Sequence, residues 1–109
     1  MAYDTAFTLD VHDAGGFAAR MLVIDSVCSA FVEQVGFDPF FDMFDWVNYE
    51  KDAAAVSALF PDHYIMISGD GEDGDDQWRD IWKGGTMAGS WSNPGWPTFV
   101  EVLNGEYNK

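Results

Sequence analysis

The chain has 109 residues, of which 48% are hydrophobic and 17% aromatic. This length suits one domain, expected to span residues 1–109, and so much apolar material excludes a disordered acidic tail. Nineteen acidic residues against five Lys and Arg give a net charge of −14. Direct binding to nucleic acid or to an anionic membrane is therefore disfavoured, because both need cationic side chains.

The single cysteine, Cys28, has no partner for an intramolecular disulfide. The first residues lack the basic and then apolar order of a secretory signal. No apolar run reaches the roughly 18 residues that are needed to span a bilayer. These features predict a soluble protein in a reducing cytoplasm.

The first half of the chain carries two clear periodic patterns. Residues 4–12 alternate between apolar and polar side chains, which predicts a strand with one buried face. From about residue 14 to residue 35, apolar residues recur at spacings of three and four and predict a helix, with Gly36 as its carboxyl-terminal cap. The residues of this apolar stripe are Phe17, Met21, Ile24, Cys28, Phe31 and Val35.

The middle of the chain predicts two further helices and a strand. Residues 37–46 interleave five aromatic residues with acids, and a short helix is favoured after Pro39. Asn48 can cap another helix, which Pro61 ends. Residues 64–67 are apolar on both faces and predict a central strand that is covered on each side.

The last third of the chain predicts a loop, a helix and a hairpin. Residues 69–76 are rich in Gly and acids, as loops are, and residues 78–83 carry apolar side chains at helical spacing. Strands at 87–91 and 98–103 then flank a turn that is rich in Pro and Gly. Four strands and three or four helices predict an α+β domain with an antiparallel sheet.

The Gly-rich and acidic loop imitates two kinds of binding site. Residues 69–74 fit a dinucleotide-binding pattern of glycines, but the surrounding acids would repel a pyrophosphate. The same acids suggest calcium, yet an EF-hand loop from Asp70 would have Asp75 and Ile81 where it needs Gly and Glu. A less regular cation site in this loop stays open as an alternative.

Two smaller groups of residues could carry chemistry. Cys28 belongs to the apolar stripe of the first predicted helix, where a thiol is usually a small inert hydrophobe. Asp10, His12 and Asp13 could meet at the end of the first strand, but they lack matching ligands elsewhere. We therefore expect no catalytic residues, no cofactor and no bound metal, and hence not an enzyme.

The acids themselves are the most informative feature, because helix caps and turns do not account for all of them. If the helix after Asn48 packs against the preceding segment, the acids of these two elements should form one negative ridge, and the acids of the Gly-rich loop should form another. The first ridge comprises Asp38, Asp42, Asp45, Glu50 and Asp52, and the second Asp70, Glu72, Asp73, Asp75 and Asp76. Two rows of carboxylates can imitate the phosphates of a nucleic acid, so their complement is a basic groove on another protein.

Exposed aromatic residues would anchor such a contact. Trp91 and Trp96 are the candidates, because a turn that carries Trp in a nearly neutral region suits a contact surface. Burial in the core is the usual place for an aromatic side chain and is the competing interpretation for both.

In size, acidity and aromatic content, and in lacking a catalytic set, the chain resembles small phage-encoded inhibitors of nucleic-acid-handling defence enzymes, including anti-CRISPR proteins and other DNA mimics. No motif carries this resemblance, so it assigns no individual residue. It implies an inhibitor, in the cytoplasm of an infected bacterial host, that occupies the basic nucleic-acid-binding surface of a defence complex. The alternative is that the acidity reflects a salt-rich habitat, which would make the chain an acidic binding module or cation-binding protein without an inhibitory role.

Overall fold

The structure is a computed structural model of the chain, and it describes residues 4–12, 15–71, 76–92 and 95–105. Among these residues it contains four strands and three helices, which confirms the expected α+β class. In chain order the elements are β1 (Thr5–His12), α1 (Phe17–Val35), α2 (Tyr49–Ala58), β2 (Tyr64–Gly71), β3 (Gln77–Lys83), β4 (Thr86–Ser92) and α3 (Phe99–Asn104).

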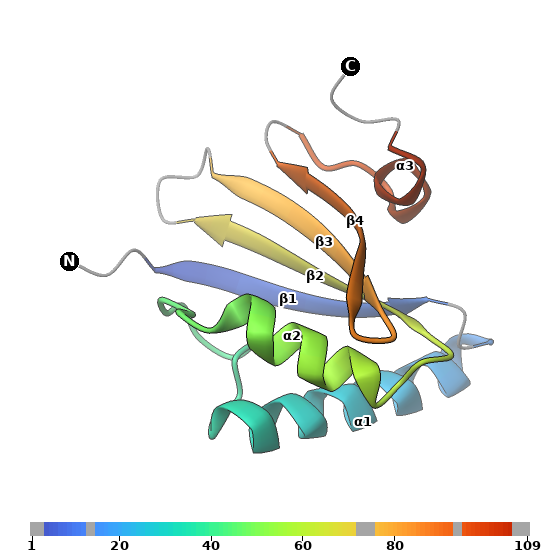
Figure 1. Cartoon of the computed structure of the whole chain (residues 1–109), viewed down its shortest axis with the longest axis horizontal. Coiled ribbons are helices and arrows are strands. Elements are labelled where there is room, and N and C mark those ends of the chain that lie inside the picture. Colours follow the sequence, from blue (N-terminus) through green and yellow to red (C-terminus); the bar gives the residue numbers. More distant parts are fainter. Residues whose placement is uncertain (1–3, 13–14, 72–75, 93–94, 106–109) are drawn as a thin grey trace.

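The four strands form one antiparallel sheet in the order β1-β2-β3-β4, so that each strand pairs with its neighbours in the chain. α1 and α2 pack together beneath the sheet, and α3 lies near β3 and β4 (Figure 1). Ile65 and Ile67 of β2 belong to the core between the sheet and the α1–α2 pair, whereas Met66 between them belongs to the core between the sheet and α3. The helices therefore cover opposite faces of the sheet, and the prediction of a central strand covered on both sides is confirmed.

The core between the sheet and the α1–α2 pair is the larger of the two. Val27 and Phe31 of α1 are fully buried there. The ring of Trp46 meets Phe7 of β1 edge-on, with 5.0 Å between centroids, and Phe31 in the same way at 5.6 Å. Burial of each large apolar side chain stabilises the fold by about 1.5 to 3 kcal/mol, so this core contributes more through apolar burial than the smaller core does.

The buried face of α1 differs from the predicted stripe. Phe17 and Met21 are 79% and 41% exposed, while Val27, which is outside the stripe, is buried. α1 packs against α2 as well as against the sheet. Its buried face is therefore rotated from the predicted stripe towards Val27. The predicted end of the helix is correct, because Gly36 adopts a φ of 98° and donates its N–H to the carbonyl of Val32.

Two elements of the last third differ from the sequence prediction. Residues 78–83 belong to strand β3 rather than to a helix. Of residues 98–103, which were predicted as a strand, Thr98 caps helix α3 and residues 99–103 lie in it. In β3, Trp82 lies in the core between the sheet and the α1–α2 pair, and Ile81 lies in the core between the sheet and α3. Because both faces of β3 are buried, its apolar residues lose the alternation that marks a strand and imitate helical spacing.

Candidate functional site

The two acid-bearing segments meet at one end of the sheet. In the connection between α1 and α2, Phe44 pairs with Thr5: the N–H of Thr5 donates to the carbonyl of Phe44 at 3.0 Å, and the N–H of Phe44 donates back at 3.2 Å. On its other side, Thr5 lies opposite Gly71 of β2. Neighbouring strands are about 4.8 Å apart, so β1 alone separates the connection from the end of β2, on the left of Figure 1.

Six exposed acids lie on these segments or in the adjoining first turn of α2, and we call them the acidic end: Asp38, Asp42, Asp45, Glu50, Asp70 and Asp76. Asp76 is held beside β2 because its carbonyl accepts the N–H of Gly71 at 2.7 Å. The sequence predicted two separate negative ridges, and the tertiary structure places their described, exposed members at the same end of the molecule. The acids reach this end from positions up to 38 residues apart in the chain.

The connection that carries Asp38, Asp42 and Asp45 is not the short helix that was expected after Pro39. Its residues 37–47 form turns and a single bridge to β1. Pro39 is buried, and the carboxylate of Asp38 accepts the N–H of Phe40 at 2.9 Å, which closes a local turn. Pairing of Phe44 with the edge of β1 replaces the hydrogen bonds that a helix would have made.

Asp52 does not lie on the acidic end, which corrects its assignment to the first ridge. Its side chain is only 8% exposed, and its carboxylate accepts hydrogen bonds from Trp46 Nε1 at 2.9 Å and from Gln34 Nε2 at 3.1 Å. The bonds join α1, the connection and α2. A buried acid with such partners stabilises the fold and is withdrawn from contact with another protein.

The three remaining acids of the second ridge, Glu72, Asp73 and Asp75, lie outside the described residues. The predicted loop at 69–76 is shorter than expected, because β2 continues to Gly71. The cation site proposed as an alternative for this loop thus falls mainly on residues that the structure does not place.

The two candidate tryptophans have different surroundings. Trp91 is 4% exposed and packs in the core under α3, so it is corrected from a contact residue to a core residue. Trp96 is 45% exposed and lies over the guanidinium of Arg79, with 4.6 Å between the Arg79 carbon and the ring centre. Arg79 also donates to the carbonyl of Pro97. Trp96 therefore remains available as an anchor, although its ring already partners a cation.

Sequence reasoning missed a set of exposed apolar residues between the acids. Phe41 is 86% exposed and Val47 81% exposed, and Phe37 and Met43 are also on the surface. The sequence interpretation placed most rings of this segment in the core. This is confirmed for Trp46, which is buried, and for Phe40 and Phe44, which are partly buried against the same core. The adjacent rings of Phe40 and Phe41 were a usable signal, because neighbouring residues cannot both point into one core.

The cations of the described residues compensate the acidic end only weakly. Arg20 binds the carboxylate of Asp10 with contacts of 2.7 and 2.8 Å. The ammonium of Lys83 lies 4.4 Å from the ring centre of Tyr64, and Arg79 is engaged as described above. Lys51, exposed on α2, is the remaining cation in the described ranges. The acids thus produce a negative field at this end.

A second buried acid, Asp80, holds α2 to the sheet. Its carboxylate accepts hydrogen bonds from Tyr49 Oη at 2.8 Å and from Ser90 Oγ at 2.7 Å, and Trp82 Nε1 donates to Tyr49 Oη at 3.0 Å. Burial raises the pKa of Asp80, and the two hydroxyl donors offset part of that rise. Burial and the neighbouring Asp80 carboxylate raise the pKa of Tyr49 far above its ordinary value, so its phenol stays protonated as a donor.

The described residues that were considered for chemistry are engaged in structural contacts, whereas Asp13 lies outside the described residues. Burial, followed by the nearby carboxylates of Asp38 and Asp25, raises the pKa of the Cys28 thiol, which opposes formation of a nucleophilic thiolate. The carboxylate of Asp10, 3.6 Å from His12 Nε2, is bound by Arg20. Within the described ranges, no three His, Cys, Asp or Glu side chains are grouped to hold a metal ion. The described helices include none with the length and apolarity to cross a membrane.

No protein-family model, no curated protein and no solved structure matches this chain. The features that bear on its function are the acidic end and the apolar side chains that lie among its carboxylates.

Proposed function

We propose that the protein is an inhibitor that binds, through its acidic end, the basic nucleic-acid-binding surface of a host defence or nucleic-acid-handling complex, in the manner of DNA mimics and anti-CRISPR proteins. The observation that supports this most is the meeting of two distant acid-bearing segments on either side of Thr5. A basic groove that normally holds phosphates would find carboxylates at this end instead.

The two kinds of exposed side chain have separate tasks in this mechanism. The carboxylates pair with Lys and Arg of the target, which speeds association and makes it sensitive to salt. Phe41 and Val47, exposed among the acids, supply apolar contacts that slow dissociation. Occupation of the groove by these groups excludes the nucleic acid without any chemical step.

The charge distribution bears on the salt-adaptation alternative. A solvated acidic coat would spread over the surface, and Asp62 and Glu101 are indeed exposed outside the acidic end, as are Asp25 and Glu33 on α1. Among the described residues, the larger group of exposed acids nevertheless gathers at one end. If the acidity serves a salt-rich habitat, the fold should collapse in dilute buffer, whereas an inhibitor of the proposed kind stays folded there.

The test is capture of a target from a bacterial lysate by the tagged protein, washed in steps of rising salt and analysed by mass spectrometry. The wild-type protein should retain a DNA-binding or RNA-guided complex that rising salt releases. The double variant Asp42→Lys with Asp45→Lys should lose that complex, because it reverses two charges of the acidic end. An empty wild-type bait in lysates of several hosts would contradict the proposal.

A matched control separates local from global charge. Asp62→Lys changes the net charge by as much as Asp42→Lys alone, at an exposed position next to the start of β2, at the opposite end of that strand from the acidic end. Asp62→Lys should still capture the complex, whereas Asp42→Lys should capture less. Equal loss in these two single variants, each shown to be folded by circular dichroism, would mean that only total charge matters. Added DNA should displace the captured complex from the wild-type protein.

A further inference from the structure

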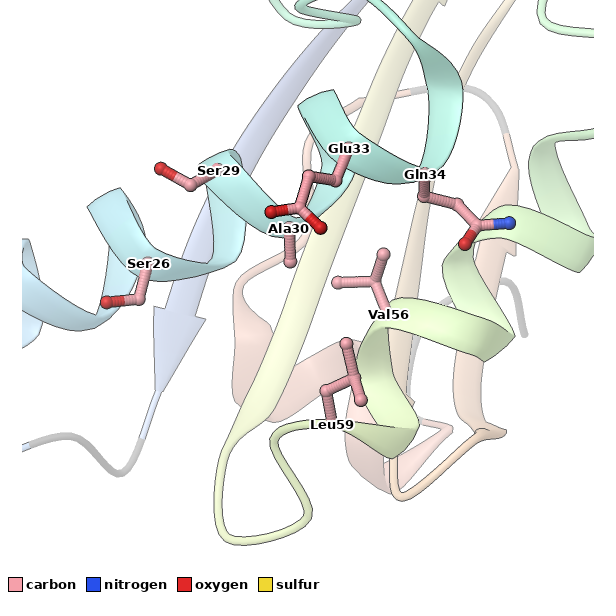
Figure 2. A pocket seen from close by; sticks show the side chains of 7 residues that line it. All are labelled: Ser26, Ser29, Ala30, Glu33, Gln34, Val56 and Leu59. Atoms are coloured by element: carbon pink, nitrogen blue, oxygen red, sulfur yellow. The ribbon is translucent and has the colours of Figure 1, made fainter.

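The seam between α1 and α2 is hollowed along its length. Its central part is a hollow of about 380 Å³ between Ser29 and Glu33 of α1 and Val56 and Leu59 of α2. Figure 2 shows Val56 and Leu59 reaching from α2 towards α1, with the carboxylate of Glu33 on the opposite wall. Val56 is buried and forms the floor, whereas Leu59 is 68% exposed and forms a rim.

This hollow continues in both directions along the seam. Ser26 lines it and also lines a hollow of about 230 Å³ next to Leu22. Gln34 likewise lines it and a hollow of about 490 Å³ next to Phe37 and Val47. We call the three together the helix groove. At a rise of about 1.5 Å per residue, the α1 wall from Leu22 to the end of the helix extends about 20 Å, which matches some four turns of a bound helix.

The groove offers apolar contacts at intervals along this length. Leu22 is 69% exposed at one end, Leu59 in the middle and Val47 81% exposed at the other end. A row of large exposed apolar side chains along a groove is unusual for a monomer and marks an interaction site. An amphipathic helix, whose apolar residues recur at three and four, presents contacts at similar intervals.

The charged residues of the groove determine which charge its occupant should carry. Glu33 and Asp45 line it, opposed by Lys51, and Glu50 lies beside Lys51 where the groove opens towards the acidic end. The cation is thus outnumbered by nearby acids, so the groove favours a helix with Lys or Arg flanking its apolar stripe. Another copy of this chain would bring a second charge of −14 and is disfavoured by repulsion. An extended strand is disfavoured because both walls are helices, whose backbone groups are already bonded.

We propose that the helix groove binds one cationic amphipathic α-helix of the target protein. Its apolar residues contact Leu22, Leu59 and Val47, and its Lys or Arg residues pair with the acids on the rim. This inference rests on the proposed function for the identity of the target, while the groove itself can be tested separately. The groove adjoins the acidic end and shares Asp45 and Val47 with it, so it extends the contact with the same partner along α1 and α2.

The probe is a synthetic 15-residue helical peptide with Leu at helical spacing and Lys at most other positions, titrated into the isotope-labelled protein and followed by NMR and fluorescence anisotropy. Saturable shifts should fall on residues that line the groove. A scrambled peptide of the same composition should bind about tenfold more weakly or worse, since one lost apolar contact is equivalent to about tenfold in affinity. A version with Glu in place of Lys should not bind. Equal binding of the scrambled peptide, or shifts confined to the acids of the acidic end that do not line the groove (Asp38, Asp42, Asp70 and Asp76), would overturn the inference.

Variants of the exposed rim provide the second test, because they leave the core intact. Leu22→Ser with Leu59→Ser should weaken peptide binding at least about tenfold. Val100→Ser, at a residue 58% exposed on α3, should bind as the wild type does. If sedimentation shows a dimer that the double variant dissociates, the groove holds a second copy and the inference fails.

The same variants separate the two proposals in the lysate experiment. If Leu22→Ser with Leu59→Ser retains the captured complex and Asp42→Lys with Asp45→Lys loses it, the groove inference fails and the proposed function stands. If the peptide binds the groove but no nucleic-acid-handling complex is captured by the wild-type protein, the groove inference stands and the proposed function fails.

Discussion

The buried acids Asp52 and Asp80 and the exposed acids of the acidic end carry the same functional group, a carboxylate, but they have opposite roles. Asp52 and Asp80 are each about nine-tenths buried, and each accepts two side-chain hydrogen bonds that join separate elements. Asp45 and Asp70 are exposed at the end of the sheet. Inside, a carboxylate is stabilising only because its partners replace water, whereas outside it keeps its hydration and contributes a field. The excess of acid in this protein therefore combines structural and surface roles.

The largest loss of stability should come from disturbing the aromatic rings around the buried Asp80. A Cβ on Gly69 would overlap the indole of Trp78, whose ring packs against Tyr49, the donor to Asp80. Gly69→Ala should lower the free energy of unfolding by about 3 kcal/mol, the upper part of the range for overpacking. Chemical denaturation measures this loss. Gly16→Ala, where no atom lies within 4 Å of the added group, should cost less than about 1 kcal/mol.

Removal of a buried carboxylate should have the next largest effect. Asp52→Ala leaves the Trp46 and Gln34 donors without their acceptor and should cost about 2 to 3 kcal/mol. Asp45→Ala, at an exposed position, should change stability by less than about 0.5 kcal/mol. Urea unfolding of the two variants side by side measures the difference between the regions. Similar losses would show that burial does not distinguish the two acids.

The pH dependence of stability should reveal the contribution of the buried Asp80. Burial raises the pKa of Asp80 in the folded protein, so its ionisation is easier in the unfolded chain. Relative to Asp80→Asn, the wild type should therefore lose stability as the pH rises from about 4, the ordinary Asp value, through the raised pKa. Below both values the difference should be constant. Unfolding of both proteins across this pH series tests the sign, and a difference that moves the other way would mean that Tyr49 and Ser90 favour the ionised form.

The smallest effect should come from neutralising the acidic end. Asp42→Asn with Asp45→Asn removes repulsion and should raise the free energy of unfolding by about 0.5 kcal/mol at low ionic strength, with the gain lost near 1 M salt, where charges are screened. Asp62→Asn should gain less than Asp42→Asn alone. Denaturant unfolding at two salt concentrations makes the comparison. Equal gains in these two single variants would argue against a field concentrated at this end.

Part of the fold could be predicted because local periodicity sets it. The alternation of residues 4–12, the helical spacing in residues 14–35 and the apolar run at 64–67 each correspond to an observed element. Two later signals were present but went unused. Gly84 and Gly85, with φ values of 59° and 89°, make the two-residue hairpin turn that joins β3 to β4. Thr98 and Glu101 form the capping box of α3, with each side chain accepting the other residue's backbone N–H.

The sequence alone thus determined the fold class, the first two long elements and the net charge, since these depend on composition and on neighbours a few residues apart. Only the tertiary structure decided which acids are surface groups and where they meet. Thr5 brings Phe44 and Gly71 to its two sides, and Asp52 turns inward because Trp46 and Gln34 supply its hydrogen bonds. These outcomes depend on strand register and on packing between distant segments, which no local spacing encodes.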